Sequence, residues 1–299
     1  MLQEFLREAG RVIIGKEQQF KLALSCLFAG GHLLLEDEPG MGKTTFAKVT
    51  ARLLNLDFSR IQFTSDLLPS DILGLSVFDK NQQAFLFQPG PIFKNLILGD
   101  ELNRASPKTQ SAFLQAMEEE AVSIDGTTYP LPKPFFMIAT QNPRRSIGTF
   151  PLPESQLDRF LMKIELGYPT REQEIAILQN PGAQTALEQL PALLTTSDIL
   201  RFQSEVRSIA VAPSLHAYIV DIAQESRKLS RGLSPRATLA LLKAAQAYAW
   251  LEKQKFITPE HVQAVAVAVM NHRLVGSEEL RPQTGSERAQ AIIRSVAVP

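Results

Sequence analysis

The stretch LLLEDEPGMGKTT, at residues 33–45, constrains the fold more than any other part of the sequence. Its leucines fit a buried strand of a parallel sheet, and the turn that follows ends in Lys43 and Thr44, where a helix can begin. Gly40 and Gly42 allow several backbone N–H groups to point inward as an anion nest, to which the helix N-terminus adds its positive dipole. We interpret this strand, turn and helix as a phosphate-binding loop, with an ordinary strand-turn-helix connection as the alternative.

The loop predicts that a nucleoside triphosphate binds here together with magnesium. Lys43 would bring a positive charge to the β- and γ-phosphates, and the Thr44 hydroxyl would ligate Mg²⁺. The pattern G-x-x-x-x-G-K-[ST] has glycine where this chain has Asp37, which we interpret as an Asx-type residue that begins the turn without impairing nucleotide binding. The predicted nucleotide-binding residues are Ile14, Gly15, Glu38, Pro39, Gly40, Met41, Gly42, Lys43, Thr44, Thr45 and Asp100.

Two acidic residues follow the apolar run LILG at residues 96–99. Because strands of an open parallel sheet bring their C-terminal residues to the ligand crevice, Asp100 is placed to hold magnesium, directly or through water. Glu101 would accept a proton from the attacking water. Asn142 follows another apolar strand, at residues 135–140, and its amide could orient that water because it both donates and accepts. Without the phosphate-binding loop, the acidic pair would be interpreted as a solvated turn.

The charge balance argues against a strong overall attraction to nucleic acid or to an anionic membrane, because 31 Lys and Arg residues match 31 Asp and Glu residues. The 299 residues favour two domains. The one cysteine, Cys26, lies among apolar residues, which favours a core position and excludes an internal disulfide. The four histidines show no metal-ligand spacing. No cleavable signal is apparent and no apolar run approaches about 18 residues, so we expect a cytoplasmic protein without direct membrane insertion.

Two β-hairpins are predicted to project from the sheet, at about residues 71–91 and 121–131. The second contains Asp125-Gly126, a strong two-residue turn signal. The alternative interpretation is that the hairpins are surface inserts without a functional role, since loops tolerate inserts. We expect the tips, around residues 80–82 and 125–126, to contact a client or partner.

The rest of the chain is predicted to be helical. Helix starts combine a capping residue with proline at Pro213-Ser214, Ser234-Pro235 and Thr258-Pro259. We therefore predict an α/β nucleotide-binding domain at 1–175, a connector at 176–196 that contains Pro and Gly, and a helical lid domain with a C-terminal tail at 197–299.

Five segments together resemble the MoxR family of AAA+ ATPases. They are PGMGKT, LILGDELNRASPKTQSAFLQAMEE, FFMIATQNP, PLPESQLDRF and GLSPRA. The resemblance covers nearly the whole chain and implies a parallel sheet of order 5-1-4-3-2 with helices on both faces, followed by a small helical lid, with ATP bound between them. The two predicted hairpins fall where this family carries its helix-2 insert and its pre-sensor-1 insert.

The resemblance also implies roles for individual residues. Lys43 and Thr44 match Walker A, Asp100 and Glu101 match Walker B, and Asn142 matches sensor 1. These assignments agree with the roles inferred above from the strand ends.

Two arginines complete the implied site. Arg159 matches the arginine finger, a guanidinium that the neighbouring subunit supplies to neutralise charge developing on the transferred phosphoryl group. The plain alternative is that it pairs with Asp158 or Glu154. Arg236 matches sensor 2, which reaches the γ-phosphate and couples it to the lid, in its own subunit or in a neighbour's.

The resemblance implies a Mg²⁺-dependent ATPase that converts ATP and water to ADP and phosphate. It also implies a homo-oligomeric ring, for which the family expectation is a hexamer. Its expected use is chaperone-like remodelling, activation or cofactor insertion in a client complex, with a von Willebrand factor A-domain partner. One alternative is a nucleic-acid motor related to the minichromosome helicases, but the first hairpin carries only Lys80 at its tip and the second has no basic residue between Val122 and Tyr129. Another is an ATP-gated scaffold with negligible hydrolysis, which Glu101→Gln would distinguish.

Overall fold

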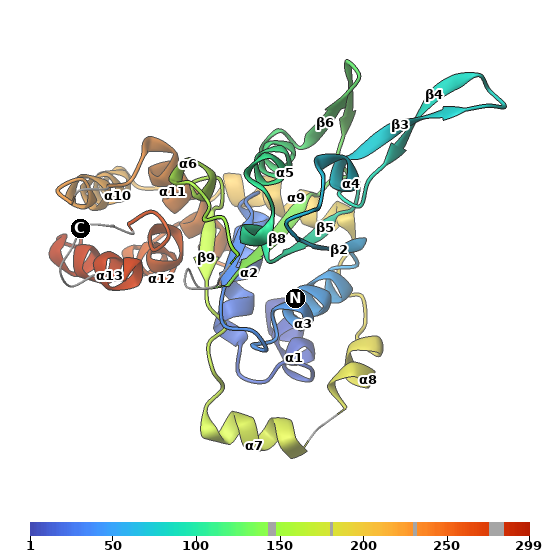
Figure 1. Ribbon diagram of the computed structural model, residues 1–299. Helices are drawn as coiled ribbons and strands as arrows, with labels where there is room; N and C mark the ends of the chain where they lie inside the picture. The colour runs from blue at the N-terminus through green and yellow to red at the C-terminus, as the bar shows by residue number, and fades with distance from the viewer. Residues whose placement is uncertain (143–147, 180–181, 230–231, 275–283) are drawn as a thin grey trace.

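A five-stranded parallel sheet forms the centre of the computed structural model, which describes residues 1–142, 148–179, 182–229, 232–274 and 284–299 (Figure 1). The strands lie in the order β2-β5-β8-β1-β9 and all neighbouring strands pair in parallel. If only these five strands are numbered in chain order, the sheet has the order 5-1-4-3-2 when it is followed from β9 to β2. The predicted order is therefore confirmed. The strands are β1 (Leu33–Glu36), β2 (Phe58–Gln62), β5 (Leu96–Asp100), β8 (Phe136–Gln141) and β9 (Met162–Ile164).

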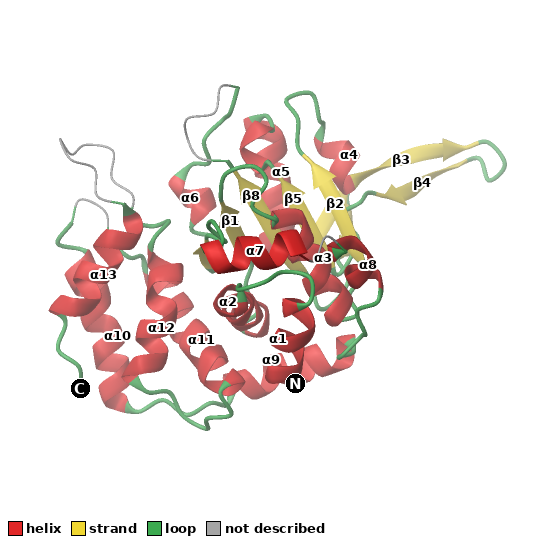
Figure 2. Cartoon of the chain, turned by 90° about the horizontal axis from the view of Figure 1, so that it is seen from below, coloured by secondary structure: helices red, strands yellow, loops and turns green. Residues whose placement is uncertain are grey.

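The sheet is buried on both faces, which is why its central strands are continuous apolar runs. Because side chains alternate along a strand, Leu33 packs in one core cluster with Phe20 and Phe46, while Leu34 packs in the other with Phe113. Figure 2 shows helices on both sides of the sheet. Those near the N-terminus are α1 (Leu2–Gly10), α2 (Glu17–Phe28) and α3 (Lys43–Leu53); the opposite face carries α5 (Pro107–Glu119) after the short 3₁₀ helix Leu102–Arg104.

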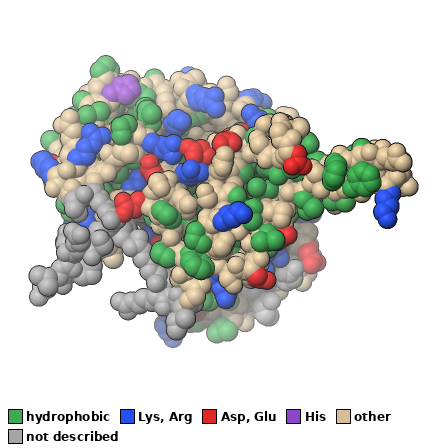
Figure 3. Space-filling view, turned by 45° about the horizontal axis from the view of Figure 1, so that its top comes forward, with side chains coloured by type: hydrophobic (Ala, Val, Ile, Leu, Met, Phe, Trp, Pro, Cys, Tyr) green, Lys and Arg blue, Asp and Glu red, His purple; other side chains and the backbone are tan. Residues whose placement is uncertain are grey.

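Both predicted hairpins are present and project from one end of the molecule (Figure 1). The first pairs β3 (Gly74–Asp79) with β4 (Ala84–Pro89) after the short helix α4 (Pro69–Leu73), and the second pairs β6 (Ala121–Ile124) with β7 (Thr127–Pro130). The Phe87 ring of the first stacks on the Tyr129 ring of the second, with centroids 4.0 Å apart. Hydrophobic side chains lie along the longer hairpin in Figure 3. Phe85, on β4, is 72% exposed.

The helical part begins with α9 (Thr196–Arg207) and continues through α10 (Pro213–Ser226), α11 (Pro235–Leu251) and α12 (Pro259–Met270) to α13 (Gly285–Ser295). Proline occupies the first turn of α10, α11 and α12, as the sequence predicts. The last helix packs against α10 and α12, so this end of the chain docks on the lid.

The predicted connector contains two helices. α7 (Arg171–Gln179) crosses the expected border at residue 175, and α8 (Ala183–Glu188) lies within the connector. We did not predict α7 as a helix from the sequence, and none of its residues is buried; its apolar side chains Ile175, Ile177 and Leu178 are exposed. The short α6 (Glu154–Leu157) precedes β9. Among the described residues, no helix is long and apolar enough to cross a membrane.

Candidate nucleotide-binding and catalytic site

The loop between β1 and α3 has the backbone of an anion-binding turn. Gly40 and Gly42 both adopt φ of +86°, a left-handed conformation that residues with a Cβ rarely take. Gly42 is the N-cap of α3, and Lys43 is the first residue of the helix. The helix N-terminus and the curled loop therefore face the same point.

Lys43 lies inside this loop with its side chain largely buried. Its ammonium donates to the backbone carbonyl of Asp37 at 2.5 Å and to Oδ1 of Asn142 at 3.2 Å. Burial lowers the pKa of Lys43, and the nearby carboxylates of Asp37, Asp100 and Glu101 oppose that shift. A phosphate bound in the loop could take the place of these two oxygens as the hydrogen-bond acceptor of Lys43.

Asp37 does not begin an Asx turn, so that prediction is wrong. Its carboxylate reaches across the sheet end and accepts hydrogen bonds from the backbone N–H groups of Leu166 at 2.6 Å and Gly167 at 3.0 Å. The side chain is buried because these donors lie just beyond β9, the neighbouring strand of β1. Asp37 therefore ties the phosphate-binding loop to the segment that leads to α7.

The carboxylate of Asp100 is already engaged by protein donors. Oδ2 accepts from Arg60 Nη2 at 2.6 Å and Nε at 3.1 Å, and Oδ1 accepts from the Thr140 hydroxyl at 2.7 Å. Arg60 lies on β2 and Thr140 on β8, the two strands that flank β5. Parallel pairing of these strands thus holds the first acidic residue from both sides.

Glu101 adopts φ of +58°, which turns the chain sharply after β5 and aims the carboxylate along the sheet edge. Its backbone N–H donates to the Thr140 hydroxyl at 2.9 Å. Oε1 accepts from Nδ2 of Asn142 at 3.2 Å, and Oε2 pairs with Arg104 at 2.9 Å. A carboxylate oriented in this way can serve as a proton acceptor for a water beside it.

Several side chains that orient the site were not predicted from the sequence. Arg60 and Arg104 bind the two acidic residues, and the buried Asn103 donates to the backbone carbonyl of Asn142 at 3.3 Å. Asn103 and Arg104 follow Glu101 by two and three positions, so their nearness to Glu101 could be predicted from the sequence. The contact of Arg60 could not, because it depends on the pairing of β2 with β5.

The predicted residues before α2 lie on the same side. Gly15 has φ of +72° and packs so closely on Gln173 of α7 that a Cβ would meet it at 1.9 Å. Lys16 donates to the backbone carbonyls of Gly167 at 3.1 Å and Tyr168 at 3.4 Å. The segment that contains Ile14 and Gly15 is therefore joined to the residues that Asp37 holds.

The two predicted arginines lie together, away from Lys43. Arg159 Nε is 3.1 Å from Oε2 of Glu118, without hydrogen-bond alignment, and Arg236 Nη2 donates to Oε1 of the same carboxylate at 2.7 Å. They line a hollow of about 470 Å³ that also includes His32, the residue before β1. Lys43 lies beyond the other end of β1, so the structure places the arginines and the phosphate-binding loop at opposite ends of that strand.

Lid and sheet meet beside this pair. Asp158 accepts from Arg273 Nε, at the end of α12, at 2.6 Å and from the hydroxyl of Ser234, the N-cap of α11, at 3.1 Å. Because Arg159 follows Asp158 and Arg236 follows Ser234 by two residues, these bonds fix the spacing of the two arginines.

Comparison with known proteins agrees with this architecture. A family described as "ATPase family associated with various cellular activities (AAA)" matches residues 32–162, and an "AAA lid domain" matches residues 223–296. The uncharacterized protein YeaC of Bacillus subtilis is 43% identical over 99% of this chain and 93% of its own length. Chaperone MoxR1 of Mycobacterium tuberculosis is 38% identical over 100% of this chain and 82% of its own. The chain belongs to the MoxR family of AAA+ ATPases.

A solved structure matches this MoxR-family chain over nearly its whole length. The crystal structure of a proposed ATPase from Cytophaga hutchinsonii has a TM-score of 0.90 and 35% sequence identity, and covers 99% of this chain and 94% of that one. The AAA+ core followed by a helical lid, predicted from the motifs, is confirmed.

The donors around Lys43 suit a magnesium-nucleotide complex. Mg²⁺ binds oxygen ligands and usually keeps several waters, so one carboxylate, one hydroxyl and the phosphates are enough. Asp100, at the end of β5, and Thr44, at the start of α3, could supply those two protein oxygens. No cluster of three or more His, Cys, Asp or Glu that could hold a metal occurs among the residues described.

Proposed function

We propose that this chain hydrolyses ATP at the loop after β1, with magnesium. The observation that carries the proposal is the position of Asn142, whose amide lies 3.2 Å from both Lys43 and Glu101. One side chain thus joins the group that would bind the γ-phosphate to the group that would take the proton from water. A nucleotide-binding protein without hydrolysis would not need this arrangement.

Each residue has a distinct part in the proposed reaction. Gly40, Gly42 and the α3 N-terminus would bind the phosphates, while Asp100 and Thr44 would hold Mg²⁺. The ion would neutralise charge that develops on the phosphate oxygens. Glu101 would accept a proton from water, and that water attacks the γ-phosphorus as the bond to the leaving ADP oxygen breaks.

The arginine pair points to a site shared between subunits. Arg159 and Arg236 lie at the opposite end of β1 from Lys43, so within one chain they face away from the bound nucleotide. We assign both to the nucleotide of a neighbouring subunit, where guanidinium groups would stabilise the transferred phosphoryl group. Head-to-tail contacts of this kind form a ring where the rotation between subunits closes, and we propose that they close as a hexamer.

For the biological role we propose chaperone-like remodelling or activation of a client complex, including cofactor insertion, with a von Willebrand factor A-domain protein as partner. The relative named Chaperone MoxR1 supports the general role. The paired hairpins, with exposed apolar side chains such as Phe78 and Phe85, are the proposed client contact. We place the protein in the cytoplasm.

Neither rival function draws support from a specific contact. A nucleic-acid motor would need basic side chains on the hairpins, yet the longer one exposes Phe78, Phe85 and Leu86 and carries a single lysine, Lys80. An ATP-gated scaffold would have no use for the bonds that orient Glu101.

The test is the steady-state ATPase rate measured against protein concentration. The specific rate should rise with concentration in the wild type and fall at least about a hundredfold in Glu101→Gln and Arg159→Ala. Arg294→Ala, an exposed arginine of α13, is the matched control and should behave as wild type. A rate that is independent of concentration and insensitive to Arg159 would exclude the shared site.

A further inference from the structure

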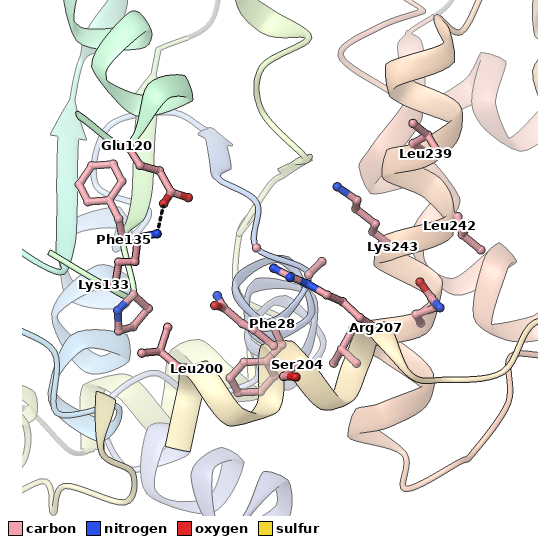
Figure 4. Close-up of a pocket in the computed structure, with 16 residues that line it drawn as sticks. Phe28, Glu120, Lys133, Phe135, Leu200, Ser204, Arg207, Leu239, Leu242 and Lys243 are labelled. Carbon is pink, nitrogen blue, oxygen red and sulfur yellow. Dashed lines mark ion pairs between the residues drawn. The ribbon is translucent and has the colours of Figure 1, made fainter. Parts of the chain in front are cut away.

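A groove opens between the lid and the sheet, next to the arginine hollow (Figure 4). We call it the α9–α11 groove; it has a volume of about 520 Å³ and is lined chiefly by Phe28, Lys133, Leu200, Arg207, Leu239 and Lys243. Two leucines of the lining are exposed to solvent: Leu200 is 40% exposed and Leu239 is 58% exposed. Exposed leucines beside a hollow indicate a surface that another chain covers.

The groove is also positively charged. In Figure 4, Lys243 of α11 and Arg207 of α9 extend toward its middle. Among the residues that the structure describes, neither side chain has a hydrogen bond or an ion pair. Among the described lining residues, Glu120 carries the one carboxylate, which lies 3.7 Å from the ammonium of Lys133. It offsets the charge of Lys133 but not the charges of Arg207 and Lys243. The occupant should therefore combine apolar and acidic side chains.

Helix α7 of the same chain has that chemistry and is uncovered. None of its residues is buried; Leu178 is 81% exposed and Ile175 is 39% exposed. Residue 178 follows residue 174 by four positions and residue 175 by three, so the Leu178 side chain lies beside both Glu174 and Ile175 on the helix surface. Figure 1 shows α7 at the edge of the molecule remote from α11, so it cannot reach the groove of its own chain.

We propose that α7 of one subunit docks in the α9–α11 groove of the next. This inference rests on the shared catalytic site proposed above. The groove shares Glu120, Leu239 and Lys243 with the hollow beside Arg159 and Arg236, so the two surfaces are continuous. On the other surface, α7 follows the segment that Asp37 and Lys16 hold beside the phosphate-binding loop.

The two contacts therefore act in the same direction around a ring. The neighbour that offers its nucleotide to the arginines also offers its α7 to the groove. Because the two contacting surfaces differ, the contact is heterologous, and repeating it builds a closed ring or a filament rather than an isolated dimer. The Leu178 side chain would enter between Leu200 and Leu239, with Glu174 near the cations.

Disulfide cross-linking tests the contact directly. The native Cys26 is buried, and burial raises the pKa of its thiol, so it should not interfere. With ATP and Mg²⁺, the double variant Leu178→Cys, Leu239→Cys should give a ladder of covalent oligomers on a non-reducing gel. A mixture of the two single variants should give covalent dimers and nothing larger. The control Leu178→Cys, Val220→Cys, with an exposed α10 position outside the groove, should give no ladder.

Charge reversal gives a second measurement. Lys243→Glu should raise the protein concentration needed for half-maximal ATPase rate at least about tenfold, whereas Lys253→Glu, beyond the end of α11, should leave it unchanged. If the ATPase rate requires Arg159 but no ladder forms and Lys243→Glu has no effect, the docking of α7 is wrong and the shared site stands. If Arg159 is also dispensable, both proposals are wrong.

Discussion

The side-chain amide of Asn142 lies 3.2 Å from the carboxylate of Glu101, and its oxygen lies 3.2 Å from the ammonium of Lys43. Asn142→Ala should remove the hydrogen bond that orients Glu101 while leaving the phosphate-binding loop intact. We therefore expect kcat to fall about 10- to 100-fold with little change in ATP affinity. ATPase kinetics and titration with a fluorescent ATP analogue would separate the two effects.

Asn81→Ala, at the tip of the first hairpin, is the control for Asn142→Ala and should retain wild-type kinetics. If Asn142→Ala instead weakens nucleotide binding and leaves kcat unchanged, the amide serves Lys43 and the phosphates rather than Glu101.

Asp37 should matter for stability more than its place in a turn suggests. Asp37→Ala would leave the N–H groups of Leu166 and Gly167 without their acceptor. Hydrogen bonds to a charged group are worth more than neutral ones, so we expect a loss of about 2–4 kcal/mol in the free energy of unfolding. Urea denaturation would measure it. Asp57→Ala, whose side chain is 72% exposed, should change the value little, and an equal loss in both variants would contradict the assignment.

The positions of side chains that follow the strands of the parallel sheet could be predicted from the sequence. Lys43, Asp100, Glu101 and Asn142 each follow an apolar run, and parallel strands bring such residues to one edge whatever the details of packing. The second hairpin was predictable for a similar reason, since Asp125-Gly126 permits a tight turn locally.

Contacts that depend on pairing between distant segments were not predictable. From the sequence alone, Arg60 on β2 would be taken for a residue on the surface of the protein. Only the pairing of β2 with β5 brings its side chain to Asp100. Glu118 reaches Arg159 and Arg236 only because α5, the β9 region and α11 converge. Helix α7 was not predicted because its apolar side chains Ile175, Ile177 and Leu178 are exposed and none of its residues is buried.

His32 should make the fold sensitive to acid. Burial lowers the pKa of His32 to about 4, and Nδ1 accepts the N–H of Met137 at 3.2 Å, which favours the neutral ring. The unfolded chain gains a proton below a pKa of about 6.5, whereas the folded chain does not until about pH 4. The contribution of neutral His32 to the free energy of unfolding is therefore complete above pH 6.5, and it is lost as the pH falls toward 4.

Urea denaturation at pH 7.5 and 5 would measure this effect. Between pH 7.5 and 5, the free energy of unfolding of the wild type should fall by about 2 kcal/mol more than that of His32→Asn. His216→Asn, at an exposed position of α10, should lose as much as the wild type. Equal losses in the wild type and His32→Asn would show that His32 does not carry the pH dependence.

The Arg60 guanidinium competes for the carboxylate that should hold magnesium. Its two nitrogens lie 2.6 and 3.1 Å from Oδ2 of Asp100, yet its own side chain is 46% exposed, so it can turn into solvent when Mg²⁺ arrives. Such a partly exposed pair is worth about 1 kcal/mol, equivalent to about fivefold in an equilibrium constant. Arg60→Gln should therefore lower the Mg²⁺ concentration that half-saturates binding of a fluorescent ATP analogue about fivefold. Arg52→Gln, on α3 and bonded to the Leu190 carbonyl, is the control and should leave that concentration unchanged. A higher Mg²⁺ requirement in Arg60→Gln would mean that the arginine positions Asp100 for the ion rather than competing with it.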